Sequence, residues 1–567
     1  MHPRNYIGLA CTVHDPALAI VSSTGEVLFA EAAERHLQTK RAFYQPPDDL
    51  VRTPAVLEAY AEPGAQLVLA HSWLERRWKS VAARLAYRVF ARRISPLLLP
   101  TMVGQSNAYD LVGLNLAYRQ FERGGRLPMI RRFYDHHLTH AAAVCYGSPF
   151  EEAACAVIDG HGEKGSHSFF HYRDGLLRPI QQIRRRQFRK NASLGLYYAA
   201  LCLACGFDPM KGEEWKVMGL AAYGRRDEVL YGRLRPLVRV DGLHLFGDNV
   251  AILEVLQALA RPRGAPSLAA ADLAFTGQLV FNELNAELLG NFYRLDLSEN
   301  LALSGGCALN SSWNGQIVGS TGFKRLHVNS APADDGNAVG AALLAYYEDH
   351  PPRRAPGRLQ SPYLGERMQP FALDALTRFG RLKNQNADLR PVEVRTAELL
   401  ADGKIVGWVQ GRAEFGPRAL GNRSILADPR RPDIKETINA RVKFREEFRP
   451  FAPSILHEHG GEYFESYQES PYMERALRFR PEVLGLVAGV VHVDGTGRLQ
   501  TVKREYNPRF YDLIAAFYAL TGIPVLLNTS FNVMGKPIIH TVEDAVATFF
   551  TSGIDALVVE DQLFVKD

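Results

Sequence analysis

The sequence predicts an α/β protein of two domains. Its 567 residues exceed what one hydrophobic core usually organises, so at least two domains are expected. Strand–turn–strand patterns recur in the first part of the chain, and two β runs with a polar loop occur in the last part. Between them, the Pro- and Arg-rich stretch "HPPRRAPGRLQSPYLG" lacks apolar periodicity. We therefore predict a linker over 356–390 that separates a domain at 1–355 from a domain at 391–567.

The first part of the chain carries two similar patterns. Residues 5–34 read as "NYIGLAC", "ALAIVSS" and "EVLFAEAAE", with a Thr-Gly turn before the last strand. At residues 153–177 a β-rich run again meets a Gly-rich acidic turn, and a hairpin follows. Backbone N–H groups at tight Gly turns can approach anionic oxygens closely. These patterns predict an internally duplicated domain whose halves face each other across a phosphate-binding cleft.

A third Gly turn follows another apolar strand. The segment "LALSGGCALN" at residues 301–310 has the glycines and the expected helix start that favour a nucleotide site. Residues 44–130 are less informative. Within them, "LERRWKSVAARLAYRVFARR" at residues 74–93 predicts a helix with a solvated basic face.

Three histidines stand within five positions in "YDHHLTHAAAVCYG", residues 134–147. His136 and His140 are four apart, so a helix would place both on one face, as a shared metal requires, while His137 would point about 100° away. Asp334, in "NSAPADDGNAVGAALLA", is the candidate third ligand, although a helix N-cap is the alternative role. Two histidines and one carboxylate suit Fe(II), and Zn(II) or Mn(II) would also accept them.

The last part of the chain concentrates arginines between two predicted strands. In "DGKIVGWVQGRAEFGPRALGNRSILAD" a loop bears Arg412, Arg418 and Arg423 beside Gly and Pro. A second β run, "IPVLLNTSFN" near residues 523–532, ends in polar groups. Arginines bind phosphate groups bidentately, so this domain is expected to bind an anionic substrate.

Composition excludes several classes of function. A net charge of +5, from 66 basic and 61 acidic residues, is too balanced to favour nucleic acid as a partner. The first apolar run ends at His14 and Asp15, and no stretch has the length of a membrane span, so no membrane association and a cytoplasmic location are expected. The six cysteines show no disulfide framework, and the pair Cys202 and Cys205 is expected in a buried helix.

Many short motifs of this chain, in collinear order, resemble the NodU/CmcH family of carbamoyltransferases. Those of the first part are "HDPALAIV", "HHLTHAAA", "VIDGHGE", "KVMGLAAYG", "LSGGCALN" and "ADDGNAVGAA". Those of the last part are "GWVQGRAEFGPRALGNRSIL", "INARVKFREEFRPFAPSIL", "PYM" and "LLNTSFNVMGKPI". The resemblance implies an actin-like (ASKHA, duplicated RNase H-like) N-terminal domain and a YrdC-like α/β C-terminal domain.

The family resemblance also implies an activity. Such enzymes use carbamoyl phosphate and ATP, with Mg²⁺, to make carbamoyladenylate in the C-terminal domain. The N-terminal domain then transfers the carbamoyl group to a hydroxyl of a small-molecule natural product, as in antibiotic or toxin biosynthesis. Fe(II) or another divalent metal is the implied cofactor. An acceptor alcohol is a weak nucleophile, so a base within hydrogen-bond reach is also required.

The matching motifs carry the family's residue roles onto this chain. The implied metal ligands are His136, His140 and Asp334. The implied catalytic residues are His14 as the base or an orienting group, Asp15 and Lys40. The residues expected around the nucleotide in the N-terminal domain are Asp159, Gly160, Gly162, Glu163, Lys216, Gly305, Gly306 and Asn310. Those expected to bind carbamoyl phosphate and ATP in the C-terminal domain are Arg412, Arg418, Arg423, Lys443, Arg449, Asn528 and Ser530.

The resemblance is weaker in two segments. Family members commonly carry "EERFTRKK" where this chain has "AAERHLQTKR" at residues 32–41, so Glu34, Arg35 and Lys40 are retained and His36 replaces the aromatic residue. Residues 44–130 match poorly, and we expect acceptor-binding loops there.

Two other functions are weighed against carbamoyl transfer to a small alcohol. A threonylcarbamoyl-type tRNA-modifying enzyme has the same domain organisation, but the near-neutral charge and the lack of a long basic tract count against this function. A nucleotide-binding regulator without transfer activity would not need the carboxylate of Asp334. The expected partners are a small-molecule alcohol acceptor and no nucleic acid, with a homodimer left open.

Overall fold

A computed structural model describes residues 3–49, 51–74, 129–181, 191–351, 357–368, 373–374, 388–446 and 448–566. Most of the helix predicted at 74–93, much of the proposed acceptor region and most of the proposed linker lie outside these residues. The predicted domain boundaries at 355 and 390 therefore stay a prediction.

Two five-stranded sheets with the same topology form the N-terminal part. The first has the order β3-β2-β1-β4-β5. Its strands are β1 (Arg4–Ala10), β2 (Ala17–Val21), β3 (Val27–Ala32), β4 (Gln66–His71) and β5 (Ile130–Phe133). The second has the order β12-β11-β6-β7-β8. Its strands are β6 (Glu152–Gly162), β7 (Gly165–Arg173), β8 (Leu176–Gln181), β11 (Asn300–Ser304) and β12 (Arg325–Val328).

In each sheet the first three strands run antiparallel and the last two pair in parallel. Thus β1 pairs antiparallel with β2 and parallel with β4, and β6 pairs antiparallel with β7 and parallel with β11. The duplication predicted from the strand–turn–strand patterns is therefore confirmed, and so is the α/β fold with an actin-like N-terminal part.

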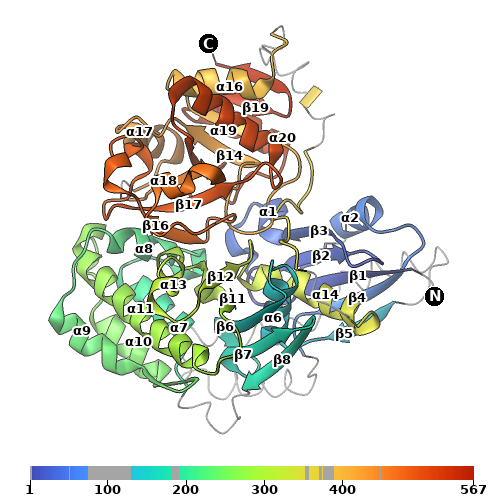
Figure 1. Cartoon of the computed structure of the whole chain (residues 1–567), viewed down its shortest axis with the longest axis vertical. Coiled ribbons are helices and arrows are strands. Elements are labelled where there is room, and N and C mark those ends of the chain that lie inside the picture. The colour runs from blue at the N-terminus through green and yellow to red at the C-terminus, as the bar shows by residue number, and fades with distance from the viewer. Residues whose placement is uncertain are drawn as a thin grey trace.

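Two helices, α6 (His136–Tyr146) and α14 (Asn337–Asp349), lie side by side between these sheets (Figure 1). Helix α14 packs on β1, β2 and β4, and α6 packs on β6 and β11. Small residues permit this close approach. A Cβ on Gly340 would stand 1.9 Å from the Thr139 carbonyl oxygen, and one on Gly8 would stand 1.7 Å from that of Ala338.

The outer faces of both sheets are also covered, which explains why their strands read as continuous apolar runs. On the first sheet, Ile7 and Leu9 pack against α2 (Arg52–Tyr60). The outer face of the second sheet packs against a larger helical layer. Its helices are α7 (Leu194–Ala204), α8 (Trp215–Ala221), α9 (Glu228–Leu234), α10 (Asn249–Ala258) and α11 (Ala271–Tyr293). Cys202 and Cys205 are buried there, as predicted.

Short elements connect the main ones. They are α1 (Ala33–Leu37), the hairpin of β9 (Arg239–Asp241) and β10 (His244–Phe246), α12 (Ser311–Asn314) and α13 (Ile317–Ser320). The helix expected after the Gly turn at 301–310 is present only as a 3₁₀ turn, Gly306–Leu309, followed by α12.

A separate eight-stranded mixed sheet forms the C-terminal part, drawn in orange to red in Figure 1. Its order is β16-β17-β15-β18-β14-β13-β19-β20. The strands are β13 (Val406–Val409), β14 (Arg423–Ala427), β15 (Ala452–Leu456), β16 (Arg475–Arg478), β17 (Thr496–Val502), β18 (Val525–Ser530), β19 (Ala556–Val559) and β20 (Gln562–Val565). The helices are α16 (Val392–Ala401), α17 (Ile434–Ile438), α18 (Gly460–Tyr463), α19 (Pro508–Thr521) and α20 (Val542–Thr551). Both predicted β runs, β13 and β18, are present.

The C-terminal part packs closely on the second half of the N-terminal part. Helix α12 contacts β16, and a Cβ on Gly315 would stand 1.9 Å from the Ala476 carbonyl oxygen. Likewise, a Cβ on Gly416 would stand 2.1 Å from that of Ser330. Among the helices of the described ranges, none is long and apolar enough to cross a bilayer.

The α6–α14 crossing predicts a position-specific effect of adding one methyl group. Gly340→Ala should lower stability by about 1–3 kcal/mol, because its Cβ collides with the Thr139 carbonyl and the core cannot expand freely. Gly232→Ala is the matched control, since a Cβ on that helical glycine would have no atom within 4 Å and alanine favours a helix. Thermal melts of the two variants would test this. Equal melting temperatures would contradict the tight crossing.

Candidate functional site

Four buried side chains converge where α6 meets the ends of β6 and β12. His136 and His140 stand one turn apart on α6, Asp159 lies near the end of β6, and Asp334 opens the 3₁₀ turn before α14. One ligand atom from each lies within 4.8 Å of the others. His136 Nε2 is 3.3 Å from Asp159 Oδ2 and 3.5 Å from Asp334 Oδ1, and His140 Nε2 is 3.4 Å from Asp334 Oδ1.

The chemistry of this set fits a divalent metal. His140 Nε2 is buried and has no hydrogen-bond partner, as expected of a ligand atom facing a cation. His136 Nδ1 is 3.3 Å from the Asn337 amide, whose Oδ1 is also buried without a partner. The atom that faces Nδ1 is Asn337 Nδ2. Turning the amide by 180° would bring Oδ1 to the ring, where it would accept the Nδ1 proton and leave His136 Nε2 free to bind metal. Two imidazoles and two carboxylates suit Fe(II), Zn(II) or Mn(II).

The carboxylates make this position attractive to positive charge. Burial alone would lower the pKa of His136, but Asp334 and Asp159 raise it well above its usual value. Burial alone would raise the pKa of Asp334, yet the neighbouring histidines hold it well below its usual range. The pair of anions therefore favours a cation between them, either a proton or a metal.

The other residues of the histidine motif have structural contacts. His137 Nδ1 lies 2.8 Å from Ser168 Oγ, and a Cβ on Gly162 would stand 2.7 Å from its Nε2, so His137 is packed. The Asp135 carboxylate caps α6 by accepting from the Leu138 N–H. The Glu163 carboxylate accepts from the His136 N–H at 2.9 Å and the Leu74 N–H at 2.8 Å. Glu163 and Gly162 thus support α6 and do not line the cavity described below.

His14 and Asp15 lie next to the four-residue cluster. His14 Nδ1 is 2.8 Å from Asp15 Oδ2 and 3.7 Å from Asp334 Oδ2. Asp15 has a positive φ of 55°, which turns the chain at this point. The Arg41 guanidinium contacts both side chains, at 3.1 Å from His14 Nδ1 and 3.1 Å from Asp15 Oδ2.

One continuous cavity of about 1600 Å³ joins this cluster to the C-terminal sheet. Of the site residues predicted in the N-terminal domain, those that line the cavity are His14, Asp15, Lys40, Asp159, Gly160, Lys216, Gly306, Asn310 and Asp334. Of those predicted in the C-terminal domain, the residues that line the cavity are Arg418, Lys443, Arg449, Asn528 and Ser530. His136 and His140 lie behind Asp159 and Asp334. Gly305, with φ of 93°, turns the chain so that the Gly306 N–H donates to Asp159 Oδ1 at 2.9 Å.

Two predicted arginines do not line the cavity. Arg412 donates to the carbonyls of Leu364 and Gly365 and lies over the Tyr60 ring. Arg423 is fully buried in β14 and donates to four backbone carbonyls, those of Gln410, Gly411, Glu366 and Asn422. In the sequence these two arginines stand close to Arg418, but the contacts of their side chains with backbone carbonyls hold them away from the cavity.

The C-terminal side of the cavity is rich in cations that are buried or half-buried. The Lys443 ammonium donates to Ser530 O, to Asn532 O at 3.0 Å and to Asn532 Oδ1 at 2.8 Å, all neutral groups. Burial, followed by Arg445, Lys40 and Arg449, lowers the pKa of Lys443 well below its usual value. Burial also lowers the pKa of Arg498 to about 10 and, together with Arg449, that of Arg445 to about 9.

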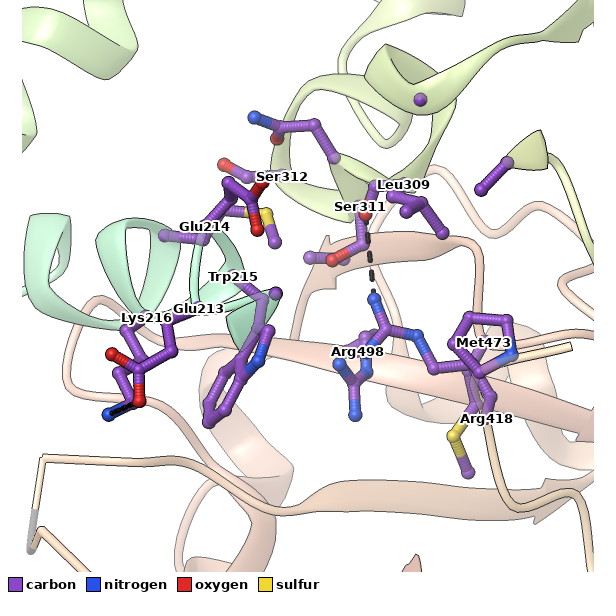
Figure 2. A pocket seen from close by; sticks show the side chains of 18 of the residues that line it. Glu213, Glu214, Trp215, Lys216, Leu309, Ser311, Ser312, Arg418, Met473 and Arg498 are labelled. Atoms are coloured by element: carbon purple, nitrogen blue, oxygen red, sulfur yellow. Dashed lines mark hydrogen bonds and ion pairs between the residues drawn. The ribbon is translucent and has the colours of Figure 1, made fainter. Parts of the chain in front are cut away.

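Such cations lose hydration without gaining carboxylate partners, so an anion in the cavity would stabilise them. Figure 2 shows Arg418 and Arg498 together, facing the loop of Leu309 and Ser311. Arg418 donates weakly to the Leu309 carbonyl at 3.5 Å. Burial and then Arg498 lower the pKa of Arg418 well below its usual value.

Ion pairs across the cavity connect the two parts of the chain. Lys216 Nζ lies 2.7 Å from Glu213 Oε1 and 3.0 Å from Glu446 Oε1. Glu446 in turn pairs with Arg449 at 2.7 Å, and Arg449 lies over the Trp215 ring. Lys216, which was expected around the nucleotide, therefore has two carboxylate partners, bridges the two parts and lines the cavity.

The structure adds residues that the sequence interpretation did not select. Asp159 was expected at the nucleotide but belongs to the four-residue cluster. The sequence feature that could have indicated this is its position near the end of a buried strand, before a Gly turn. Arg445 lies within the quoted motif "INARVKFREEFRPFAPSIL" and Arg498 within strand β17, and both line the cavity. Arg41 follows Lys40 directly in the segment where the resemblance is weak.

Comparison with known proteins matches both parts of the chain. Residues 5–343 match the family model "Carbamoyltransferase N-terminus" and residues 397–566 match "Carbamoyltransferase C-terminus". Nodulation protein NolNO of Sinorhizobium fredii is 38% identical over 447 residues, which cover 76% of this chain and 64% of that protein. The 3'-hydroxymethylcephem-O-carbamoyltransferase of Amycolatopsis lactamdurans is 38% identical over 47% of this chain and 49% of its own length.

Among solved structures, HypF in its phosphate- and nucleotide-bound form matches 61% of this chain and 46% of its own, at 11% identity and a TM-score of 0.35, which supports no conclusion about function. The two family models together extend over nearly the whole sequence, in the order of the two parts seen in the structure. This chain therefore belongs to the carbamoyltransferase family.

Proposed function

We propose that this protein is an ATP-dependent O-carbamoyltransferase that uses carbamoyl phosphate to make carbamoyladenylate and passes the carbamoyl group to a hydroxyl of a small-molecule natural product. The observation that carries this proposal is the single cavity. It joins a set of buried or half-buried cations, suited to phosphate groups, to His14 beside a cluster of metal-ligand type. The named carbamoyltransferase among the relatives supports the same chemistry.

The first half-reaction fits the C-terminal side of the cavity. Water hydrolyses carbamoyl phosphate to phosphate and carbamate. A carbamate oxygen then attacks the α-phosphorus of ATP, and pyrophosphate leaves; Mg²⁺ would neutralise the charge of the phosphates. Arg418, Lys443 and Arg498 would hold the phosphate oxygens, and their desolvation strengthens each contact.

Asn528 is positioned to recognise the carbamoyl group itself. Its Nδ2 donates to the Ala419 carbonyl, to Ser454 Oγ and to Gln500 Oε1, which fixes the orientation of the amide. Its Oδ1 is buried and has no partner. That oxygen can therefore accept a hydrogen bond from the NH₂ of carbamate, a contact that a simple carboxylate would not make.

The second half-reaction fits the N-terminal side. The acceptor oxygen attacks the carbamoyl carbon and AMP leaves. We assign His14 as the base that takes the hydroxyl proton at Nε2, since its Nδ1 faces Asp15. Held by His136, His140, Asp159 and Asp334, Fe(II) or another divalent metal would supply Lewis acidity for oxygen ligands at this end. Gly306 and Asn310 line the expected nucleotide position.

The first experiment is to measure carbamoyl-phosphate-dependent release of pyrophosphate from ATP, followed together with AMP and ADP and without any acceptor. We expect pyrophosphate only when carbamoyl phosphate is present. Formation of ADP, or no turnover with ferrous iron and Mg²⁺ supplied, would contradict the adenylation step. The latter result, in a protein that still binds ATP, would favour the regulator.

Replacing one histidine of the cluster should separate the two half-reactions. His136→Ala should lose bound metal and carbamoyl transfer while pyrophosphate release persists, because the cations of the C-terminal side are untouched. His137→Ala is the matched control: it removes a neighbouring buried imidazole that packs against Ser168, so metal should remain. Metal content by mass spectrometry and pyrophosphate release would be measured on both. Equal metal loss in the two variants would reject the ligand assignment.

Substitution of Arg418 and of Arg412, which belong to one loop, should affect pyrophosphate release differently. Arg418→Ala should reduce pyrophosphate release by roughly 100-fold or more, since a desolvated charge-assisted contact to phosphate is lost. Arg412→Ala removes an arginine six positions earlier that bonds carbonyls outside the cavity, so release per folded molecule should change little. A larger loss in Arg412→Ala than in Arg418→Ala would reverse our assignment.

A further inference from the structure

Arg41 lies in a strained segment beside His14. Between residues 38 and 44, Gln38, Arg41, Ala42 and Tyr44 all have positive φ, at 50°, 59°, 38° and 60°. Residues with a Cβ adopt this conformation only at a cost in free energy, so it persists where surrounding contacts enforce it. Such concentrated strain in a cavity wall indicates that the position of a side chain matters.

The Arg41 guanidinium uses all three of its nitrogens. Nε and Nη2 donate to Asp15 Oδ2 at 3.3 and 3.1 Å. Nη2 also lies 3.1 Å from His14 Nδ1, but the two nitrogens form no hydrogen bond with each other while Nδ1–H donates to the same Asp15 oxygen. On the other side, Nη1 donates to the Pro209 carbonyl at 2.9 Å and to Glu214 Oε1 at 3.3 Å. A lysine has three donors on one nitrogen and cannot reproduce this planar fork.

These contacts tie together the two halves of the N-terminal part. Asp15 and His14 follow β1 in the first half, while Pro209 and Glu214 precede α8 in the second. The segment between them packs directly on the arginine, since a Cβ on Gly212 would stand 3.1 Å from Arg41 Cδ. The guanidinium therefore fixes the two walls of the cavity at the level of His14.

The consequence for His14 follows from a shared atom. Asp15 Oδ2 is the oxygen that faces His14 Nδ1 at 2.8 Å and also the one that Arg41 holds. A carboxylate held in this way keeps the Nδ1 proton directed toward it and leaves Nε2 for the acceptor hydroxyl. Without the arginine, Asp15 would be free to rotate away.

We propose that Arg41 is a positioning residue for carbamoyl transfer, which fixes Asp15 against His14 and ties both to residues 209–214. This inference rests on the proposed role of His14 as the base. Arg41 acts through Asp15 and His14 and does not itself touch the reacting atoms.

The test compares Arg41→Met and Arg41→Lys with Arg132→Met in the full chain. Arg132 is a matched control: it bonds Asp349 at 2.6 Å and the Ala345 carbonyl at 2.7 Å, and its side-chain exposure of 17% is close to the 20% of Arg41. Arg132 belongs to β5, its side chain bonds residues of α14, and it does not line the cavity.

Nitrogen NMR of protein that carries labelled histidine and is loaded with diamagnetic Zn²⁺ would show which ring nitrogen of His14 carries the proton. The His14→Gln variant identifies its signals. We expect a single Nδ1–H form in the wild type and in Arg132→Met, and averaging with the Nε2–H form in both Arg41 variants. His14 signals that stay unchanged in both Arg41 variants would overturn the proposal, whatever the enzyme's reaction is.

Kinetics provide the second readout, with methanol as the alcohol probe and methyl carbamate as the product. Arg41→Met should lower kcat for this transfer by roughly 100-fold, as expected for a misplaced base, and leave pyrophosphate release within about twofold. A parallel fall of both rates in Arg41→Met and Arg41→Lys would show a structural role and overturn the proposal. Absence of pyrophosphate release in the wild type would instead count against the proposed function, and the NMR comparison would still decide the role of Arg41.

Discussion

The close crossing of α6 and α14 between two topologically equivalent sheets is the constraint on which the rest of the structure depends. Gly340 allows α14 to meet the backbone of α6 at Thr139, and Gly8 allows β1 to meet α14 at Ala338. Because α6 carries both histidines and Asp334 immediately precedes α14, this contact determines the distance between the imidazoles and the carboxylate. The second sheet adds Asp159 from the end of β6. A four-residue cluster thus results from backbone packing of small residues.

Charge is distributed unevenly along the cavity. At one end, two buried carboxylates among histidines favour a cation. At the other, Lys443 is buried, Arg418 and Arg498 are half-buried, and none of the three forms an ion pair with a carboxylate of the described residues, so this end favours an anion. Lys216, Glu446 and Arg449 lie between and compensate one another. The two ends of this one cavity therefore differ in the charge they favour, which fits the two half-reactions that we propose.

The outcome at individual residues shows where sequence interpretation succeeds. The HxxxH pair was correctly placed on one helical face because a period of 3.6 residues is a local property. The strand–turn–strand patterns likewise predicted the duplication of the N-terminal part, whereas its actin-like fold was implied by the family resemblance. In contrast, Arg412, Arg418 and Arg423 occupy one short loop and its following strand with similar local chemistry. Only the tertiary structure distinguishes them. Of the three, Arg418 lines the cavity, whereas Arg412 and Arg423 donate to backbone carbonyls.

By itself the sequence determined the α/β class, the duplication, the histidine face and, through its motifs, the carbamoyltransferase family. The class, the duplication and the histidine face follow from periodicity and turn chemistry, which neighbouring residues encode, and the family follows from the resemblance of the motifs. The tertiary structure alone decided that Asp159 joins the cluster, that Lys216 pairs with Glu213 and Glu446, and that Arg41 holds Asp15 against His14. Each of these contacts depends on how segments distant in sequence pack together, and local patterns cannot specify which of several similar charged groups the packed core turns toward a shared cavity.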